Sequence, residues 1–381
     1  MPSIANADPE TDARFMAAAI ALARRHLGAT QPNPSVGAIV VAPGPVPHVL
    51  GRGVTAPGGR PHAEPQALAQ AGAAARGATI YSTLEPCSHI GKTPPCVDAI
   101  IRAGIARVVV AVLDPDPRVA GRGCRFLREA GVDVSTGVMT AAAEEGLAGF
   151  LTHRRLGRPH LTLKLAVSPD GAIGRAGEAN VAVTGAAARA AVHAMRAESD
   201  AVMVGIGTAL ADDPRLDVRL DGVIDRKPLR VVIDAEARLP LASRLVRTAP
   251  EHPVWVIAGG GAPSARMRAL RDAGVHVIEA ARDDAGRVSL ADALRLLGLY
   301  GVMSVLCEGG TELAAALLAH DLVDRVALFE GAIPLGAGAI AAPPSLANRG
   351  AGLRERFLLV GARAHGPDRL STFERRHRDK G

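Results

Sequence analysis

The sequence predicts two α/β domains. Its 381 residues are too many for one ordinary hydrophobic core. Short β-branched apolar runs alternate along the chain with segments in which apolar residues recur at helical spacing. Strands that alternate with helices form sheets with helices packed on their faces. Because Gly157-Arg158-Pro159 interrupts this pattern, we expect one domain at residues 1–153 and a second at residues 158–381.

The first domain is expected to open with a helix and to continue as alternating strands and helices. Pro65 is tolerated only in the first turn of a helix, which places one helix start at about residue 64. Pro94-Pro95 stand before an apolar run that opens at Cys96. The expected helices are residues 12–26, 64–73, 96–103, 122–130 and 140–153, and the expected strands are residues 36–41, 48–55, 78–83, 107–112 and 132–138.

A metal site is predicted in this domain from one histidine and two cysteines. His62, Cys87 and Cys96 make a three-ligand zinc set that leaves the fourth position open for water, as catalytic zinc requires. Glu64 lies two residues from His62 and can act on that water as an acid or base without being a ligand. Cys96 is expected at a helix N-terminus, where the helix dipole favours the thiolate. We expect one zinc ion per chain.

The plain alternative is two buried cysteines and a surface histidine without a metal. This alternative explains each of these residues when it is considered alone. It does not explain their order, H-x-E…P-C…C, which is similar to the signature of zinc-dependent nucleobase deaminases.

Composition excludes several classes of protein. Hydrophobic residues are 48% of the chain and charged residues 22%, as in globular proteins. No apolar run reaches the length of a membrane span, and the polar start is not expected to be a signal peptide. Four cysteines, two of them assigned to metal, indicate a reducing compartment. We therefore expect a cytoplasmic protein with no membrane partner.

The net charge of +6 raises the question of a nucleic-acid partner. Aromatic residues are only 2% of the chain, with one Trp and two Tyr, so stacking platforms for bases are scarce. A phosphorylated small-molecule substrate explains a modest positive excess equally well. We expect no nucleic-acid partner and interpret the basic segment 369–380 as a solvated end. A homo-oligomer remains open.

The second domain is expected to form around a strand at residues 160–168. Alternation along this strand places Thr162, Lys164 and Ala166 on one face. A lysine among apolar neighbours is costly unless it faces a pocket, the alternative being an edge strand in solvent. The other expected strands are residues 201–205, 229–234, 253–258, 275–279, 302–307, 323–330, 353–361 and 369–374, and the expected helices are residues 186–198, 264–273, 289–299 and 311–319.

Gly309-Gly310 joins a strand to a helix that begins at Thr311. Free backbone N–H groups and the helix dipole make such a junction suitable for a phosphate group. The glycines alone are weak evidence, since many turns need them.

The first domain resembles a known family in the loop between its two cysteines. Eight residues separate Cys87 from Cys96, in the sequence PCSHIGKTPPC. With the preceding His-Ala-Glu, this loop resembles the bifunctional deaminase/reductase family of riboflavin biosynthesis, and the resemblance extends over about residues 12 to 375. It implies a cytidine-deaminase-like α/β/α sandwich. The residues that it implies in substrate contact are Asn33, His89, Lys92 and Asp114. The family often has His at Thr55 and Asn at Asp116, so these two are polar replacements expected at the pocket rim.

The second domain resembles the reductase domain of the same family, in the segments LKLAVSPDG and TALADDPRL together with the Gly-Gly junction. This domain is similar to dihydrofolate reductase and uses NADPH. The resemblance implies cofactor contacts at Ala166, Thr208, Asp212 and the segment 310–316 that starts with Gly310 and Thr311, and substrate contacts at Asn180, Arg196, Leu216, Arg219 and Glu308. Ala182 stands where the family usually has a Trp that packs on the cofactor.

The resemblance implies two reactions on one small molecule, a zinc-dependent deamination followed by an NADPH-dependent reduction. Lys164 would polarise the reducible group and Glu308 would orient the substrate. One alternative is a deaminase for tRNA or free cytidine with an unrelated second domain. Another is a zinc-stabilised structural module, which needs a fourth protein ligand that the sequence does not clearly offer.

Overall fold

The computed structural model describes residues 8–89, 91, 93–116, 120–220, 222, 226–346 and 350–376. The chain divides into two compact units, Met1–Gly157 and Arg158–Gly381, and each is described by itself. In the described part of the chain, no helix combines the length and the apolar character that crossing a membrane requires.

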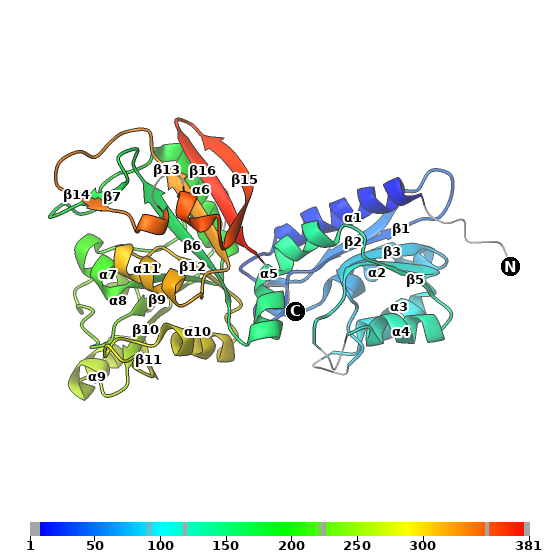
Figure 1. The fold of residues 1–381 in the computed structure, drawn as a ribbon. Helices are drawn as coiled ribbons and strands as arrows, with labels where there is room; N and C mark the ends of the chain where they lie inside the picture. The colour runs from blue at the N-terminus through cyan, green and yellow to red at the C-terminus, as the bar shows by residue number, and fades with distance from the viewer. Residues whose placement is uncertain are drawn as a thin grey trace. The chain divides into compact units, whose positions relative to one another are not determined.

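The first unit is a sheet between two layers of helices (Figure 1). Its strands are β1 (Gly37–Val41), β2 (Val49–Val54), β3 (Thr79–Leu84), β4 (Arg107–Val112) and β5 (Asp133–Thr136). Its helices are α1 (Pro9–Arg24), α2 (Ala63–Ala71), α3 (Cys96–Ala103), α4 (Arg122–Glu129) and α5 (Thr140–Leu156). The strand order is β2-β1-β3-β4-β5; β1 is antiparallel to β2 and β3, and β3, β4 and β5 are parallel. Helices α1 and α5 cover one face, and α2, α3 and α4 cover the other (Figure 1).

Glycines bring two of these helices against the backbone of the sheet. A Cβ atom on Gly37 would lie 2.0 Å from the Ala19 carbonyl oxygen of α1. A Cβ atom on Gly53 would lie 2.0 Å from the Ala63 carbonyl oxygen of α2. Real Cβ atoms do not approach so closely, so these positions require glycine. The start of α2 is therefore held at a fixed height above the sheet.

The second unit is built on a larger, mostly parallel sheet. Its main strands are β6 (His160–Val167), β8 (Ala201–Gly205), β9 (Leu229–Ile233), β10 (Val254–Gly259), β11 (His276–Ala280), β12 (Ser304–Cys307), β13 (Arg325–Glu330), β15 (Phe357–His365) and β16 (Asp368–Arg375). Their order is β11-β10-β9-β8-β12-β6-β13-β16-β15. Only the pairings of β16, with β13 and with β15, are antiparallel among the described strands of this sheet.

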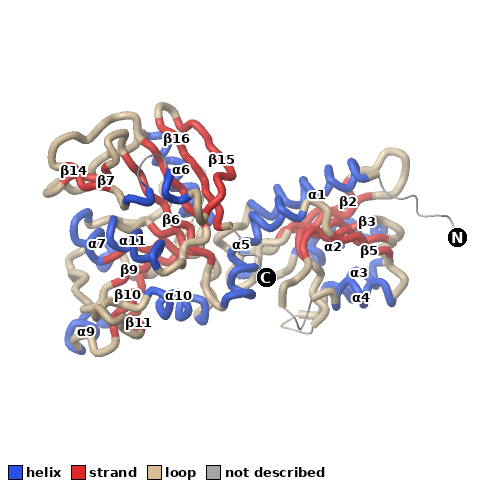
Figure 2. The backbone as a smooth tube through the Cα atoms, viewed as in Figure 1, coloured by secondary structure: helices blue, strands red, loops and turns tan. Residues whose placement is uncertain are grey.

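The helices of the second unit follow individual strands. They are α6 (Ala186–Glu198), α7 (Ile206–Asp212), α8 (Arg244–Arg247), α9 (Ser264–Asp272), α10 (Leu290–Leu299) and α11 (Thr311–Ala319). A separate antiparallel pair of short strands, β7 (Ala172–Arg175) and β14 (Ala339–Ala341), lies apart from the main sheet (Figure 2). The sequence did not predict α7, α8, β7 or β14.

Two expectations for this unit need correction. The strand expected at residues 353–361 is β15, which starts only at Phe357, because Ala351–Leu353 forms a 3-10 turn. The basic segment 369–380 is not a free end at its start, since residues up to Arg375 belong to β16, although Arg369 itself is exposed. There Arg369 pairs with Glu330 at 3.9 Å, and Arg375 pairs with Asp321. The residues beyond 376 lie outside the described chain.

Strand β6 lies between β12 and β13, in the interior of the sheet. Its burial alternates as the sequence predicted: Leu161, Leu163 and Leu165 belong to the hydrophobic core, and Lys164 faces the other side. The alternative of an exposed edge-strand lysine is therefore wrong.

Candidate active sites

Three loops of the first unit bring the predicted zinc ligands together. His62 is the residue before α2, Cys87 follows the end of β3, and Cys96 is the first residue of α3. The ligand atoms of these three residues all lie within 4.8 Å of one another. His62 Nδ1 lies 3.4 Å from Cys96 Sγ and 3.7 Å from Cys87 Sγ. Ligands of a tetrahedral zinc ion at ordinary N and S bond lengths lie about 3.6 Å apart, so the group has the dimensions of a zinc site.

The electrostatics of the two thiols also suit a cation. The pKa of Cys87 is lowered to about 4 by a hydrogen bond with Cys96 and, against the effect of burial, by His62. The backbone N–H of Cys96, at the start of α3, also donates to Cys87 Sγ at 3.3 Å. The pKa of Cys96 is raised by its hydrogen bond with Cys87 and by burial. The two thiols therefore share a proton in the absence of a cation; a cation between them would allow both thiols to ionise.

Glu64 is placed to exchange protons beside this group. It stands in the first turn of α2, and its exposed fraction is 4%. Burial raises its pKa to about 7, and the negative charge on Cys87 adds to the shift. A carboxyl group with a pKa near the working pH can both accept and donate a proton.

Among the described residues, the group that can hold a metal has three members. His89 is exposed and does not belong to it. Three protein ligands and an open position are typical of catalytic zinc, whereas structural zinc has four protein ligands. The described part of the site therefore favours the catalytic type over a zinc-stabilised structural module.

The structure describes two further residues that the sequence predicted in substrate contact, Asn33 and Asp114. The Asn33 side-chain amide donates to the Gly59 carbonyl oxygen at 2.8 Å, three residues before His62. Asp114 follows the end of β4, and burial raises the pKa of its carboxyl group. Lys92 lies outside the described residues.

The two departures from the family pattern are not at an exposed rim. Thr55 is buried, and its hydroxyl oxygen accepts the backbone N–H of Val36 at 3.0 Å. Asp116 is also buried, and its backbone N–H donates to Asp114 Oδ1 at 2.9 Å. Thr55 therefore stabilises the start of β1, and Asp116 helps to fix Asp114.

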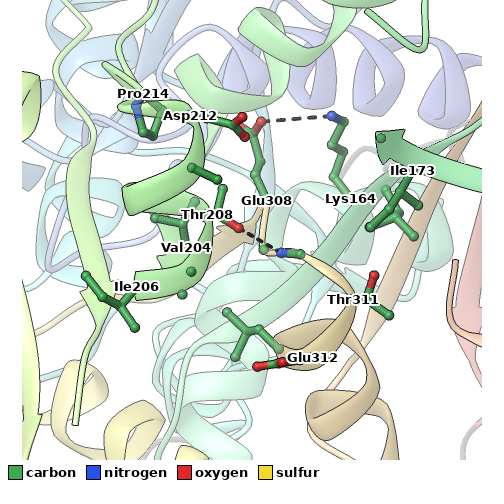
Figure 3. A pocket seen from close by; sticks show the side chains of 18 of the residues that line it. Lys164, Ile173, Val204, Ile206, Thr208, Asp212, Pro214, Glu308, Thr311 and Glu312 are labelled. Atoms are coloured by element: carbon green, nitrogen blue, oxygen red, sulfur yellow. Dashed lines mark hydrogen bonds and ion pairs between the residues drawn. The ribbon is translucent and has the colours of Figure 1, made fainter. Parts of the chain in front are cut away.

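The second unit contains a cavity of about 1350 Å³ (Figure 3). Apart from Ala314 and Ala315 of the segment 310–316, it is lined by the residues that the sequence placed in the second site: Lys164, Ala166, Asn180, Ala182, Arg196, Thr208, Asp212, Leu216, Arg219, Glu308, Gly310 and Thr311. Pockets for a single ligand measure about 300–1,000 Å³, so this cavity has room for a cofactor together with a substrate.

A cluster of charges lies in this cavity. Arg196 of α6 binds the Glu308 carboxylate through Nε at 2.6 Å and Nη2 at 3.0 Å. The third nitrogen, Nη1, donates to the Asp217 carbonyl oxygen at 2.9 Å. Lys164 Nζ lies 4.0 Å from the same carboxylate (Figure 3). Burial lowers the pKa of Lys164, and although burial alone would raise the pKa of Glu308, Arg196 and Lys164 keep it lowered.

Two strand-to-helix turns meet at the middle of the cavity. Thr208 stands in the first turn of α7, and Gly310 precedes α11. The backbone N–H of Gly310 donates to Thr208 Oγ1 at 3.1 Å (Figure 3). Nearby, Asn180 donates to Asp212 through its backbone N–H at 2.9 Å and its side-chain amide at 3.1 Å. Two helix N-termini that face one cavity suit the phosphates of a dinucleotide.

His193, which was not predicted from the sequence, also lines the cavity. It lies one turn before Arg196 on α6, and its Nδ1 atom accepts the backbone N–H of Arg219 at 3.2 Å. Its pKa is lowered by burial and by the charges of Arg196 and Arg219. The spacing of three residues from Arg196 was the available signal, since such residues share one face of a helix.

Family models match both parts of the chain. The model of the RibD C-terminal domain matches residues 159–368, and that of the cytidine and deoxycytidylate deaminase zinc-binding region matches residues 9–112. The riboflavin biosynthesis protein RibD of Aquifex aeolicus is 38% identical over 329 residues, which cover 86% of this chain and 89% of the relative. The RibD protein of Escherichia coli is 38% identical over 339 residues, with the same two coverages.

Solved structures agree along nearly the whole chain. Acinetobacter baumannii RibD has a TM-score of 0.84 at 36% identity and covers 97% of this chain and 100% of its own. A diaminohydroxyphosphoribosylaminopyrimidine deaminase/5-amino-6-(5-phosphoribosylamino)uracil reductase of Thermotoga maritima has a TM-score of 0.80 at 32% identity, with coverages of 96% and 99%. The predicted fold class, a cytidine-deaminase-like sandwich and a dihydrofolate-reductase-like α/β unit, is confirmed. The chain therefore belongs to the RibD family of bifunctional deaminases and reductases of riboflavin biosynthesis.

Proposed function

We propose that this chain catalyses two successive steps of riboflavin biosynthesis on one substrate. The first unit deaminates 2,5-diamino-6-(5-phosphoribosylamino)pyrimidin-4-one to 5-amino-6-(5-phosphoribosylamino)uracil. The second unit reduces the ribosyl group of that product to ribityl. The observation that carries the proposal is the presence, on one chain, of a three-ligand metal group beside a buried acid and of a cavity large enough for a cofactor and a substrate.

In the first unit, His62, Cys87 and Cys96 would hold a zinc ion, which when bound would supply an activated water for hydrolysis at carbon C2. Glu64 accepts a proton from that water and passes it to the amino group, which departs as ammonia. A pKa near 7 suits both transfers. The substrate contacts assigned to this unit are Asn33, His89, Lys92 and Asp114.

In the second unit, Ala166, Ala182, Thr208, Asp212, Gly310 and Thr311 would hold NADPH, which when bound would supply a hydride. The net reaction would add two hydrogens, one at ribosyl carbon C1′ and one at the ring oxygen, which becomes a hydroxyl group of the opened chain. Lys164 lies on the cavity face of β6 and polarises the reducible group, and Glu308 orients the substrate.

The two arginines of this site have different tasks. The fork of Arg196 is engaged with Glu308 and the Asp217 carbonyl oxygen, so Arg196 holds Glu308 in place. Arg219 is exposed at the cavity and pairs with Asp217 only at 3.3 Å, so it is the arginine that meets the ribose phosphate. Asn180 and Leu216 complete the substrate contacts.

Product analysis tests this proposal. Purified protein is incubated with the diaminopyrimidine phosphoriboside, with and without NADPH, and the products are identified by mass spectrometry. We expect exchange of an amino for an oxo group without NADPH, and a further gain of two hydrogens with it. Cytidine, deoxycytidine and tRNA serve as alternative substrates. Release of ammonia from one of these, and none from the diaminopyrimidine, would overturn the assignment.

We also propose that the protein acts in the cytoplasm. The relatives that it matches are riboflavin biosynthesis proteins, and all four cysteines are free thiols in the structure. Fractionation of cells followed by immunodetection of the chain tests the location.

A further inference from the structure

Glu85 is a buried carboxylate next to the metal group that neither reaction uses. It stands between the end of β3 and Cys87, and its exposed fraction is 4%. Its Oε2 atom accepts the backbone N–H groups of Asp114 at 3.1 Å and Gly121 at 3.0 Å. Its Oε1 atom accepts the backbone N–H of Cys124 at 3.2 Å. Three backbone donors on one carboxylate are more than a chance surface contact provides.

These three hydrogen bonds join segments that are distant in sequence. Asp114 follows the end of β4, whereas Gly121 and Cys124 form the start of α4. The carboxylate therefore also lies at a helix N-terminus, where the dipole stabilises a negative charge. The start of α4 also packs closely against the segment that carries Glu85. A Cβ atom on Gly123 would lie 2.2 Å from the Pro86 carbonyl oxygen, so this close approach requires glycine.

The direction of the Asp114 side chain follows from this arrangement. Glu85 holds the backbone N–H of Asp114, and the Asp114 carboxylate accepts the backbone N–H of Asp116 at 2.9 Å. Residue 114 is thereby fixed relative to Cys87, which follows Glu85 by two positions. We propose that Glu85 is a positioning residue for deamination, which sets the place of the Asp114 carboxylate against the metal group for substrate binding. This inference rests on the proposed function of the first unit.

The competing explanation is that Glu85 only caps α4 and stabilises the fold. The two explanations differ in how Glu85 couples to Asp114. A residue that acts through Asp114 loses its effect on substrate binding once the Asp114 contact has been removed. A residue that only stabilises the fold affects each background alike.

The experiment measures deamination kinetics and zinc content of the full-length protein carrying Glu85→Gln, Asp114→Asn or both. Glu85→Gln keeps the shape of the side chain but replaces one acceptor oxygen by a donor group. We expect KM to rise about tenfold, as the misplacement of one polar substrate contact produces, with kcat reduced less. Zinc content and reduction of the deaminated substrate should match the wild type. In the Asp114→Asn background, Glu85→Gln should leave KM unchanged.

Two further variants keep the test decisive. Gly123→Ala perturbs the same contact from α4 and should reproduce the rise in KM. Glu129→Gln, an exposed residue of α4 that pairs with Arg125 at 3.6 Å, is the matched control and should behave as wild type. A poorly folded Glu85→Gln protein that shows a wild-type KM at low temperature would overturn the inference.

The outcomes separate this inference from the proposed function. If the wild-type protein does not deaminate the diaminopyrimidine, the proposed function is wrong. If it does, and Glu85→Gln raises KM by the same factor with and without Asp114, Glu85 is only a structural residue. An unchanged KM in both Glu85→Gln and Gly123→Ala would also reject the inference.

Discussion

Lys164 Nζ, on β6, and Glu308 Oε2, on the residue that follows the neighbouring parallel strand β12, lie 4.0 Å apart at the wall of the second-unit cavity. Their side chains are 19% and 10% exposed, and Arg196 binds the same carboxylate. Two cations thus share one anion away from bulk water. Removing the anion leaves two cations facing each other, whereas removing Lys164 leaves a complete ion pair.

Glu308→Gln should therefore destabilise the second unit more than Lys164→Ala does. We expect Glu308→Gln to lower the free energy of unfolding by about 3 kcal/mol. Urea unfolding followed by the fluorescence of Trp255, the single tryptophan of the chain, reports on this unit. Glu279→Gln, on the exposed side of β11, is the control. Equal losses in Glu308→Gln and Lys164→Ala would contradict the shared-anion arrangement.

Lys164→Ala should stop the reduction and spare the deamination. Loss of one group that stabilises developing charge typically costs about 10²–10³-fold in rate. We expect ammonia release at the wild-type rate and accumulation of the deaminated ribosyl compound, measured by mass spectrometry. Lys227→Ala, an exposed lysine of the same unit, should form the ribityl product normally. A full yield of ribityl product from Lys164→Ala would remove the lysine from the reaction.

Cys87→Ser and Cys96→Ser should each lower the zinc content well below one ion per chain. The thiolates supply two of the three protein ligands, and metal binding contributes to the stability of the folded unit. Atomic emission on the purified variants measures the zinc, and thermal unfolding measures the stability. Cys124→Ala removes a buried thiol outside the group and should keep its zinc. Full zinc occupancy in both serine variants would mean that the ligands are wrongly assigned.

Glu64→Gln should separate the two reactions. It keeps the size of the side chain and removes the proton transfer, which typically costs about 10²–10⁴-fold in rate. Given the diamino substrate, the variant should consume almost no NADPH. Given 5-amino-6-(5-phosphoribosylamino)uracil, it should oxidise NADPH at the wild-type rate, measured by absorbance. Loss of this second activity in a folded, zinc-loaded variant would indicate one composite site in place of two.

The stability of the second unit should fall in mild acid because of His160. This residue starts β6, and burial lowers its pKa to about 4. An unfolded histidine titrates near 6.5, so the unfolded state binds more protons than the folded state between these values. The free energy of unfolding therefore decreases as the pH falls from about 6.5 towards 4, by up to about 3 kcal/mol, and this group contributes no slope above that range.

Trp255 fluorescence in urea at several pH values measures this slope. His160→Leu should flatten it, and His320→Gln, at the exposed C-terminal end of α11, should not. An unchanged slope in His160→Leu would assign the acid sensitivity to other groups.

Much of the architecture could be predicted because it depends on sequence patterns that extend over only a few neighbouring residues. The alternation along residues 160–167, Pro65 in the first turn of α2 and the prolines before α3 act within a few residues of the chain. The pairing of β7 with β14 could not be predicted, since both strands are short and their partners lie far apart in sequence. Helix α7 could not be predicted either, because Gly207 and Thr208 have low helix propensity.

In the two sites, too, features marked by local sequence order could be predicted, and features that join distant segments could not. His62, Glu64 and the two cysteines could be identified from their order, because that order is a known signature. The ion cluster of Lys164, Arg196 and Glu308 draws on three separate elements, so no spacing marks it. The hydrogen bonds of Glu85 were equally invisible, because their donors are backbone groups, which every residue type provides.

The close packing of Gly53 against α2 predicts that mutations at this glycine impair the first unit. A methyl group at this position would collide with the carbonyl of Ala63, the residue between His62 and Glu64. A search for riboflavin auxotrophs should therefore recover Gly53→Ala alongside changes in the ligands themselves. Natural variants at this glycine would be scored as harmless by any method that inspects only the residues with reactive side chains.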